Sequence, residues 1–323
     1  MKAAVVTEFG RSPRYTDVPA PTPVGDQLVG RVAAASVKNL DRGLVAGTHY
    51  GSAALTPPFV AGIDGVVELP DGRLVFSSAV SPHGMMAEQT VVDPKQAVTL
   101  PSGFDPVLAA AIPNPGLSAW FSLEYAAQLL AGQSVLILGA TGVTGSVAAQ
   151  LAKSTFGAGR VIVAGRNGER LQKLCDAGAD GSVQLGDDFG RQIAALHDEQ
   201  PFDAVLDYVW GPAAEQVLDA LGNTGLGSGY HRTRFVQIGS MAGATITLPA
   251  AVLRSAGVEL VGVGIGSVPA EAQARATSEL LPQLFASVAS GALTIDVDAR
   301  PLSEVEAVWS APAAAGTRVV LTP

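Results

Sequence analysis

Apolar residues near the start of the chain fall in short runs that glycine and proline interrupt. Such runs predict short β-strands separated by turns. The predicted strands are Ala3–Val6, Gln27–Ala34, Phe59–Leu69, Leu74–Phe76 and Gln89–Val92. The segment Asp41–Pro58 has few periodic apolar residues and many small ones, so we predict a surface loop with a single helical turn there. Loops on a rigid scaffold often carry functional residues, which makes this loop a candidate part of a site.

The pattern changes near Pro106, where apolar strands begin to alternate with helices. The predicted strands are Ser134–Leu138, Arg160–Ala164, Ala204–Leu206, Arg234–Ile238 and Glu259–Val263. The predicted helices are Val107–Ile112, Ser118–Leu130, Thr144–Ser154, Glu169–Ala177, Ala213–Leu221 and Glu271–Ser290. Because these strands lack polar alternation, they indicate a parallel sheet that helices cover on both faces. The tail returns to short strands, at Ile295–Val297 and Arg318–Leu321, and we expect it to rejoin the first region.

The predicted fold class is therefore α/β, with a doubly wound Rossmann sheet and a second, β-rich domain. The length of 323 residues suits two domains of about 150 residues each. We place the β-rich domain at residues 1–117 and 291–323. The nucleotide-binding domain is placed at residues 118–290.

A glycine-rich turn follows the first strand of the alternating region. Gly139 permits a tight turn, Gly142 lets the backbone approach a pyrophosphate, and Gly145 lets the next helix pack close to the strand. The helix that follows offers free N–H groups and the positive end of its dipole to phosphates. The loop residues expected to bind a dinucleotide are Gly139, Thr141, Gly142, Val143 and Thr144. The alternative is a plain βα turn without a ligand, and the strand–turn–helix context favours the dinucleotide.

The end of the second strand distinguishes the two nicotinamide cofactors. NAD-binding domains place an acidic residue there, about 20 residues after the glycine loop, to hold the ribose 2′-hydroxyl. This chain has Gly165, Arg166 and Asn167 at that place and no carboxylate. A guanidinium group binds a 2′-phosphate with charge-assisted hydrogen bonds, so the sequence favours NADPH. The alternative interpretation of Arg166 is a solvated surface charge.

Composition limits the class of partner and the compartment. The formal net charge of -9 disfavours nucleic acid, because an acidic surface repels phosphates. The start of the chain lacks a basic segment followed by an apolar run, and Gly, Pro or charge interrupts every long apolar stretch. Cys175 is the only cysteine, which excludes an intramolecular disulfide and fits a reducing compartment. We expect a cytoplasmic protein with a small-molecule substrate and no membrane or nucleic-acid partner.

Several short motifs occur in a characteristic order along the whole chain. They are Met1–Val6, Ala35–Asp41, Gly62–Val67, Gly84–Glu88, Ala109–Trp120, the glycine loop, and Val236–Ser240. In order and spacing, the chain resembles the zinc-free, quinone oxidoreductase-like members of the medium-chain dehydrogenase/reductase superfamily. The resemblance implies a GroES-like fold for the β-rich domain, which carries the substrate side. It further implies a reductase that transfers hydride from NADPH to a quinone or an α,β-unsaturated carbonyl, and a homodimer that pairs through strand Glu259–Val263.

We expect no metal site. Zinc-dependent members of the superfamily take Cys and His ligands from the first domain, and Ile63 stands where their Gly-His-Glu motif supplies the histidine. The four histidines show no ligand spacing, and Cys175 lies on a predicted Rossmann helix. Without a Lewis acid, activated double bonds become the favoured hydride acceptors.

The resemblance also suggests substrate-side groups. Asn39 falls in the segment that corresponds to the Asn-x-x-Asp segment of the quinone oxidoreductases, and Tyr50 follows a Gly-x-x-Tyr pattern. Either side chain can donate to the acceptor oxygen on which negative charge develops, and His49 is a reserve donor. Turn capping and packing are the alternative roles, and delivery of the proton by solvent needs no dedicated residue.

Further cofactor contacts follow from the resemblance and from the ends of the predicted strands. These residues are Ser118, Ile238, Gly239, Ser240, Val263, Gly264 and Ile265. For Arg318 in the tail, the sequence leaves a cofactor contact and a structural role open. Two other functions also stay open. One is reduction of a specialised ketone or imine, and the other is NADPH binding by a sensor that does not turn it over.

Overall fold

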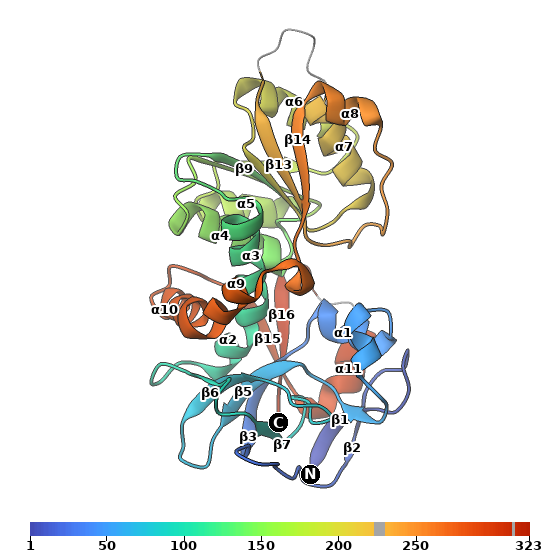
Figure 1. Cartoon of the computed structure of the whole chain (residues 1–323), viewed down its shortest axis with the longest axis vertical. Coiled ribbons are helices and arrows are strands. Elements are labelled where there is room, and N and C mark those ends of the chain that lie inside the picture. Colours follow the sequence, from blue (N-terminus) through green and yellow to red (C-terminus); the bar gives the residue numbers. More distant parts are fainter. Residues whose placement is uncertain (223–229, 312–313) are drawn as a thin grey trace. The chain divides into compact units, whose positions relative to one another are not determined.

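The structure is a computed structural model that describes residues 1–222, 230–311 and 314–323 (Figure 1). The chain forms two compact units, one of residues 1–113 and 274–323 and the other of residues 114–273. The second unit ends at residue 273, earlier than the predicted end of the nucleotide-binding domain at residue 290. Helix α10 (Leu281–Ala289) belongs to the β-rich unit because Phe285 packs against Phe76 and Phe104, with ring centroids 6.3 and 5.7 Å apart. Residues 223–229 of the predicted nucleotide-binding domain and residues 312–313 of the tail lie outside the described residues.

The second unit is built on a parallel sheet, of which the described residues form six strands in the order β11-β10-β9-β12-β13-β14. The strands are β9 (Ser134–Leu138), β10 (Arg160–Gly165), β11 (Gly181–Gln184), β12 (Ala204–Asp207), β13 (Arg232–Gln237) and β14 (Gly257–Gly262). Every residue of β9 is buried, as expected for a strand covered on both faces. The strand order reverses between β9 and β12, and ligands of such sheets bind at this reversal.

Helices cover both faces of this sheet. They are α4 (Val143–Ser154), α5 (Gly168–Asp176), α6 (Phe189–Glu199), α7 (Gly211–Gly222) and the short α8 (Ala250–Ser255). One face of β9 presents Leu136 and Leu138 to a core that α6 and α7 complete. Val135 and Ile137 point to the other face and are also fully buried, and α4 packs on β9 and β10. The predicted doubly wound Rossmann sheet is confirmed.

The first unit is β-rich. Its described residues form a seven-stranded sheet, ordered β15-β16-β3-β5-β6-β8 with β7 also paired to β3, and a three-stranded sheet β2-β1-β4. The strands of the larger sheet are β3 (Leu28–Ser36), β5 (Asp64–Glu68), β6 (Leu74–Ser78), β7 (Gln89–Val92), β8 (Val98–Thr99), β15 (Asp296–Pro301) and β16 (Thr317–Thr322). The smaller sheet has β1 (Lys2–Val6), β2 (Arg14–Asp17) and β4 (Phe59–Val60). The tail joins this unit through β16, which pairs antiparallel with β3, as predicted.

Short helices flank these sheets. They are α1 (Asn39–Ala46), η1 (Tyr50–Ala54), α2 (Pro106–Ala111), α10 and α11 (Val305–Ser310), with a π-helical segment, η4 (Ala276–Leu280), before α10. Helix α9 (Ala270–Arg275) begins in the second unit and ends in the first. A shared core of buried residues includes Val32, Val45, Phe59, Met85, Met86 and Leu321. Residues from both ends of the chain therefore build one core in this unit.

The prediction of a surface loop at residues 41–58 was wrong. The structure has helix α1 and the 3₁₀ helix η1 there. Asp41, Leu44 and Val45 share the buried face of α1 at helical spacing, and the left-handed Gly47 (φ 72°) ends the helix. Asp41 is a charged residue on the buried face of α1, so the sequence did not show the apolar pattern of an amphipathic helix.

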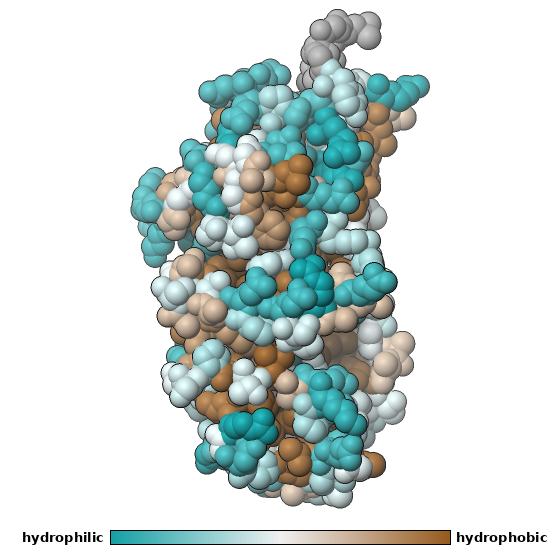
Figure 2. All heavy atoms as spheres, turned by 60° about the vertical axis from the view of Figure 1, so that its left-hand side comes forward, coloured by the Kyte–Doolittle hydropathy of each residue, from teal (hydrophilic) through white to brown (hydrophobic). Residues whose placement is uncertain are grey.

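Within the described residues, no helix combines the length and the apolar composition that crossing a bilayer requires. Hydrophilic residues cover much of the visible face of each unit in Figure 2, and hydrophobic residues reach the surface among them in small groups. Large exposed hydrophobic side chains in the second unit include Leu253, Leu260 and Ile265.

Candidate active site

The glycine loop joins β9 to α4 with the tight geometry that its sequence predicts. Gly139 has a φ of 88°, a left-handed conformation that disfavours other residues, and its N–H donates to the carbonyl oxygen of Ala164 at 2.9 Å. A β-carbon on Gly145 would lie 2.5 Å from the carbonyl oxygen of Gly139. Helix α4 therefore begins directly against the turn, in the strand–turn–helix arrangement that holds a pyrophosphate.

The first turn of α4 leaves donors for a ligand. Its N-cap is Gly142, which has no side chain to cap the helix. Among the described residues, the N–H groups of Val143, Thr144 and Gly145 have no acceptor. These groups lie at the positive end of a helix of 12 residues, which is a suitable place for an anion. The backbone of this loop therefore fits the phosphates of a dinucleotide.

The end of β10 lies against the same loop. A β-carbon on Gly165 would lie 2.5 Å from Thr141 Cγ2, so only glycine fits there. Arg166 follows as an exposed residue, and its carbonyl oxygen accepts from the Gln184 side chain at 2.9 Å. Asn167 caps α5, because its side chain accepts from the N–H of Arg170 at 3.1 Å. The structure thus gives Asn167 a capping role and leaves the Arg166 guanidinium without an ion pair among the described residues.

The ends of β13 and β14 carry six more of the predicted cofactor residues of this unit. The N–H groups of Ile238 and Gly239 donate to the carbonyl oxygen of Asp207 at 2.8 and 3.1 Å. The N–H of Val263 donates to the carbonyl oxygen of Gln237, whereas Gly264 and Ile265 are exposed at the start of the short helix η3 (Ile265–Ser267). Ser240 is exposed beside Gly239. All six residues follow the carboxyl ends of their strands.

Asp207 is a buried titratable group for which the sequence predicted no role of its own. It ends β12 next to the glycine loop, where it pairs with Leu138, and its side chain is completely buried. Oδ1 accepts from the N–H groups of Val209 and Trp210 at 2.8 and 2.9 Å, while Oδ2 has no partner among the described residues. Burial raises the pKa of Asp207 to about 6, against the opposing effect of these two N–H groups. Burial also raises the pKa of the neighbouring Tyr208.

The structure corrects the position of Ser118. The predicted helix begins at 118, but helix α3 (Pro113–Phe121) already includes it in its second turn. Two prolines are tolerated in the first turn of α3, because N–H groups there have no intrahelical acceptor. The carbonyl oxygen of Ser118 accepts from Ser122 Oγ at 2.6 Å.

In the first unit, the turn from β3 into α1 holds the predicted Asn39. Asn39 is exposed and is the first residue of α1, and Lys38 is the N-cap. Asp41 Oδ2 accepts from the N–H of Lys38 at 2.9 Å, and Oδ1 accepts from the N–H of Ile63 at 3.1 Å. In an Asn-x-x-Asp segment, the asparagine stands three residues before the aspartate. In this chain Lys38 stands three residues before Asp41, and Asn39 stands only two residues before it.

Lys38 belongs to a buried charge cluster, which we define as Lys38, Asp41, Asp64 and Arg318. Lys38 Nζ lies 2.8 Å from Asp64 Oδ1 and 3.2 Å from Asp41 Oδ2. Burial alone lowers the pKa of Lys38, but Asp41 and Asp64 outweigh it, and the pKa is raised overall. Arg318 Nη1 donates to the carbonyl oxygen of Val37 at 3.2 Å. The structure therefore places Arg318 inside the β-rich unit with this cluster.

Tyr50 and His49 form an aromatic pair at the start of η1. Their ring centroids are 4.0 Å apart, and Tyr50 is 69% exposed. His49 Nδ1 accepts from the N–H of Gly51 at 3.0 Å. An Nδ1 atom that accepts cannot carry the proton, so the neutral ring presents Nε2–H as a donor. Both side chains can therefore donate a hydrogen bond, and their roles toward a substrate remain predictions.

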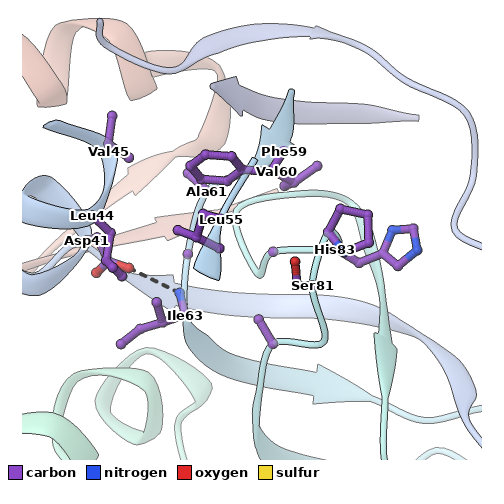
Figure 3. Close-up of a pocket in the computed structure, with 14 residues that line it drawn as sticks. Asp41, Leu44, Val45, Leu55, Phe59, Val60, Ala61, Ile63, Ser81 and His83 are labelled. Carbon is purple, nitrogen blue, oxygen red and sulfur yellow. Dashed lines mark hydrogen bonds between the residues drawn. The ribbon is translucent and has the colours of Figure 1, made fainter. Parts of the chain in front are cut away.

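A pocket of about 130 Å³ opens in the same unit (Figure 3). Its walls are mainly apolar, from Leu44 and Val45 of α1, from Leu55, and from Phe59 to Ile63. Ser81 and His83 add polar groups from the loop after β6, and Asp41 lies beside Ile63. Apolar walls with a few polar groups are typical of small-molecule sites.

The described residues contain no group of three or more His, Cys, Asp or Glu side chains that could hold a metal ion. The N–H of Ile63 donates to Asp41 Oδ1 at the position where the sequence resemblance implies a histidine in zinc-dependent members. The predicted absence of a metal remains a prediction.

Comparison with known proteins places these features in a family. The family model described as zinc-binding dehydrogenase matches residues 143–281. The probable NADPH-dependent quinone reductase tdiC of Emericella nidulans is 28% identical over the full length of both chains. The trans-enoyl reductase pgmF of Aspergillus terreus is 28% identical over 60% of this chain and 59% of its own length. The quinone oxidoreductase from Thermus thermophilus, whose complex with NADPH has been solved, matches all of both chains with a TM-score of 0.81 and 28% identity.

The fold and the glycine loop thus define an oxidoreductase of the medium-chain dehydrogenase/reductase superfamily. Within that superfamily, the chain belongs to the quinone oxidoreductase-like family, as the sequence resemblance implied.

Proposed function

We propose that this protein reduces a quinone or an α,β-unsaturated carbonyl with NADPH and without zinc. The observation that carries the proposal is the glycine loop with its uncapped helix α4, in a chain similar over its full length to quinone reductases. The similarity to a trans-enoyl reductase over part of the chain supports the enone as the alternative acceptor to the quinone.

NADPH fits the residues at the sheet edge of the second unit. Its nicotinamide supplies the hydride when bound. The N–H groups of Val143 and Thr144 would hold the pyrophosphate, next to Gly142 and the side chain of Thr141. The exposed Arg166 would bind the 2′-phosphate beside Gly165, where no carboxylate competes for it. Backbone groups at Ile238–Ser240 and Val263–Ile265 would hold the nicotinamide end, with Ser118 as a further contact.

The acceptor side lies in the first unit. The apolar pocket beside Asp41 and Ile63 suits the ring or the chain of an acceptor, because its volume of about 130 Å³ matches a small apolar group. Asn39 and Tyr50 are the proposed donors to the acceptor oxygen, with His49 Nε2–H as a third. These groups stabilise negative charge as hydride arrives, and solvent delivers the proton where no side chain does.

Zinc independence is part of the proposal. Lys38 and Ile63 occupy the segments from which zinc-dependent members take ligands, and neither side chain is a zinc ligand. An acceptor activated by conjugation needs less oxyanion stabilisation than a simple alcohol or ketone. We therefore expect added zinc and chelators to leave turnover unchanged.

Three further features complete the proposal. A homodimer would pair through β14, the edge strand of the parallel sheet, where Leu260 is exposed. The substrate is a small molecule, since the net charge of -9 opposes nucleic acid. The single Cys175 supports a cytoplasmic location.

The first experiment compares NADPH and NADH binding by fluorescence titration and follows NADPH oxidation with quinones, enones, ketones and imines. We expect NADPH to bind more tightly and quinones or enones to be reduced. NADPH binding without turnover of any acceptor would instead indicate a sensor, and reduction of ketones or imines alone would indicate a specialised reductase. Absence of NADPH binding would overturn the assignment of the glycine loop.

A double variant tests the proposed donors. Asn39→Ala/Tyr50→Phe removes the amide and the phenol together, and both residues are exposed, so we expect the fold to persist. Loss of one oxyanion donor typically costs about 100-fold in kcat. Reduction should fall by a comparable factor while NADPH affinity is kept. Unchanged turnover in this variant would remove both residues from the mechanism.

A further inference from the structure

The ammonium group of Lys38 is buried at the end of β3. The Lys38 side chain is 1% exposed. Nζ donates to Asp64 Oδ1 at 2.8 Å, to the carbonyl oxygen of Ser36 at 2.9 Å and to Ser36 Oγ at 3.1 Å. An ammonium group has three N–H donors, and these three acceptors use all of them. Lys38 therefore does not donate a proton or a hydrogen bond to a substrate in this arrangement.

The contacts of Lys38 tie together two segments that line the pocket. Asp64 is the first residue of β5, directly after Ile63. Asp41 accepts from the Lys38 backbone with one carboxylate oxygen and from the Ile63 N–H with the other. Asp41 and Ile63 both line the pocket, and Figure 3 shows the hydrogen bond between them. The start of α1 and the start of β5 are thus held together around one ammonium group.

The cluster places two acidic and two basic side chains out of contact with water, which is costly. Lys38, Arg318, Asp41 and Asp64 are all 9% exposed or less, and burial raises the pKa of Asp64. Burying ion pairs often gains no stability over apolar residues of similar volume. A geometric or electrostatic requirement at the pocket explains such a cluster better than stability does.

We propose that Lys38 is a positioning residue of the reductase, which fixes Asp41 and Ile63 in the pocket wall and neutralises the carboxylate of Asp41. The inference rests on the proposed function. Hydride transfer places negative charge on the acceptor oxygen, and an uncompensated carboxylate in the wall opposes that charge. The ammonium group, 3.2 Å from Asp41 Oδ2, removes this opposition. Its effect falls on the acceptor reaction and not on NADPH, whose proposed site lies in the other unit.

The test uses the double variant Lys38→Met/Asp64→Asn. It replaces one acidic and one basic buried group with side chains of similar size, and it takes away the ammonium group that lies 3.2 Å from Asp41 Oδ2. The matched control is Arg31→Met/Glu68→Gln, which removes an exposed ion pair between β3 and β5, the strand that also carries Asp64. Arg31 and Glu68 line neither the pocket nor the charge cluster.

For the double variant, we expect kcat/KM for the acceptor to fall at least about tenfold, since small displacements at a reacting site are costly. NADPH affinity should stay within about twofold, since the glycine loop belongs to the other unit. Amide hydrogen exchange at Ile63 should accelerate at least about tenfold, because its acceptor Asp41 loses its anchor. The control should match the wild type in all three measurements. If the double variant does not fold, Lys38→Arg, which keeps the charge and changes the geometry, should show the same pattern.

A folded double variant with wild-type kcat/KM and wild-type exchange at Ile63 would overturn the inference. A variant that is less stable but has normal kinetics would also overturn it, because it would reduce Lys38 to a structural residue. The exchange measurement needs no turnover. Faster exchange at Ile63 in a protein that reduces no acceptor would refute the proposed function and leave the positioning contact intact.

Discussion

Gly165 and Thr141 lie so close together that a β-carbon at residue 165 would approach Thr141 Cγ2 to 2.5 Å and Thr141 Oγ1 to 2.8 Å. Thr141 belongs to the glycine loop, and Gly165 ends the neighbouring strand β10. Two segments of the proposed NADPH site are therefore in direct contact. A side chain at residue 165 has to displace the loop that would hold the pyrophosphate.

The first prediction concerns this contact. We expect Gly165→Ala to weaken NADPH binding at least about tenfold, because the displaced loop misaligns the N–H groups of α4. Adding Thr141→Ala removes the two clashing atoms and should restore much of the affinity. The matched control is Gly186→Ala in the same unit, where a β-carbon meets no atom within 4 Å. Fluorescence titration measures all three variants, and equal affinity of Gly165→Ala and the control would contradict the placement of the cofactor.

The second prediction concerns the choice of cofactor. Arg166 is exposed directly after β10, and no carboxylate of the described residues pairs with it. We expect Arg166→Ala to weaken NADPH binding about 10- to 100-fold, since a charge-assisted contact to the 2′-phosphate is lost. NADH carries no 2′-phosphate, so its affinity should not change. Lys173→Ala, an exposed cation on α5, is the control. Parallel loss of both cofactors would mean that Arg166 supports the loop and does not read the phosphate.

Local signals allowed prediction of the strand β9 and its glycine turn. The strand is uniformly apolar after its first residue, and its bounds of Ser134–Leu138 agree with the prediction. The turn needs only neighbouring residues, because its geometry depends on glycines at fixed spacing. The order of short motifs then allowed prediction of the two kinds of domain.

Long-range contacts explain what the sequence did not show. Lys38 acquires its role from Asp64, 26 residues away, and the Val37 carbonyl accepts from Arg318, 281 residues away. Contacts between residues so far apart in the sequence produce no periodic pattern of apolar and polar residues. Asp41 occupies a buried helix position only because Lys38 and Ile63 satisfy its carboxylate, so the apolar pattern of α1 was incomplete. A lysine directly after an apolar strand, with an aspartate three residues later, was the local signal available.

The third prediction concerns pH and Asp207. Burial raises its pKa to about 6 in the folded protein, from the ordinary value of 3.8. Between these values, the folded state binds a proton that the unfolded state does not, so this group adds stability as the pH falls through about 6. Above that pH, the buried carboxylate costs the folded state up to about 3 kcal/mol.

Asp207→Asn removes this dependence, because its amide oxygen can still accept from Val209 and Trp210 without a charge. The variant should be more stable than the wild type at about pH 7.5, and the advantage should shrink toward about pH 4.5. Urea unfolding followed by tryptophan fluorescence measures the difference, since Trp210 adjoins the site. A stability difference that is the same at both pH values would show that Asp207 ionises normally.

The last prediction concerns the edge strand β14. Its neighbour in the sheet is β13, and it pairs with no other described strand, so its outer backbone groups face away from the sheet. An unpaired edge strand with an exposed Leu260 can pair with the same strand of a second copy of the chain. In monomeric proteins, lysine side chains commonly prevent such pairing at edge strands. Leu260→Lys should therefore shift the protein from dimer to monomer in light scattering after size exclusion. Leu253→Lys on α8 is the control, because Leu253 is similarly exposed, 43% against 41%, but does not lie on the edge strand.

A dimer that survives Leu260→Lys, or a wild type that is already monomeric, would show that β14 is not the interface. Loss of the dimer in both variants would point to α8 and β14 acting together.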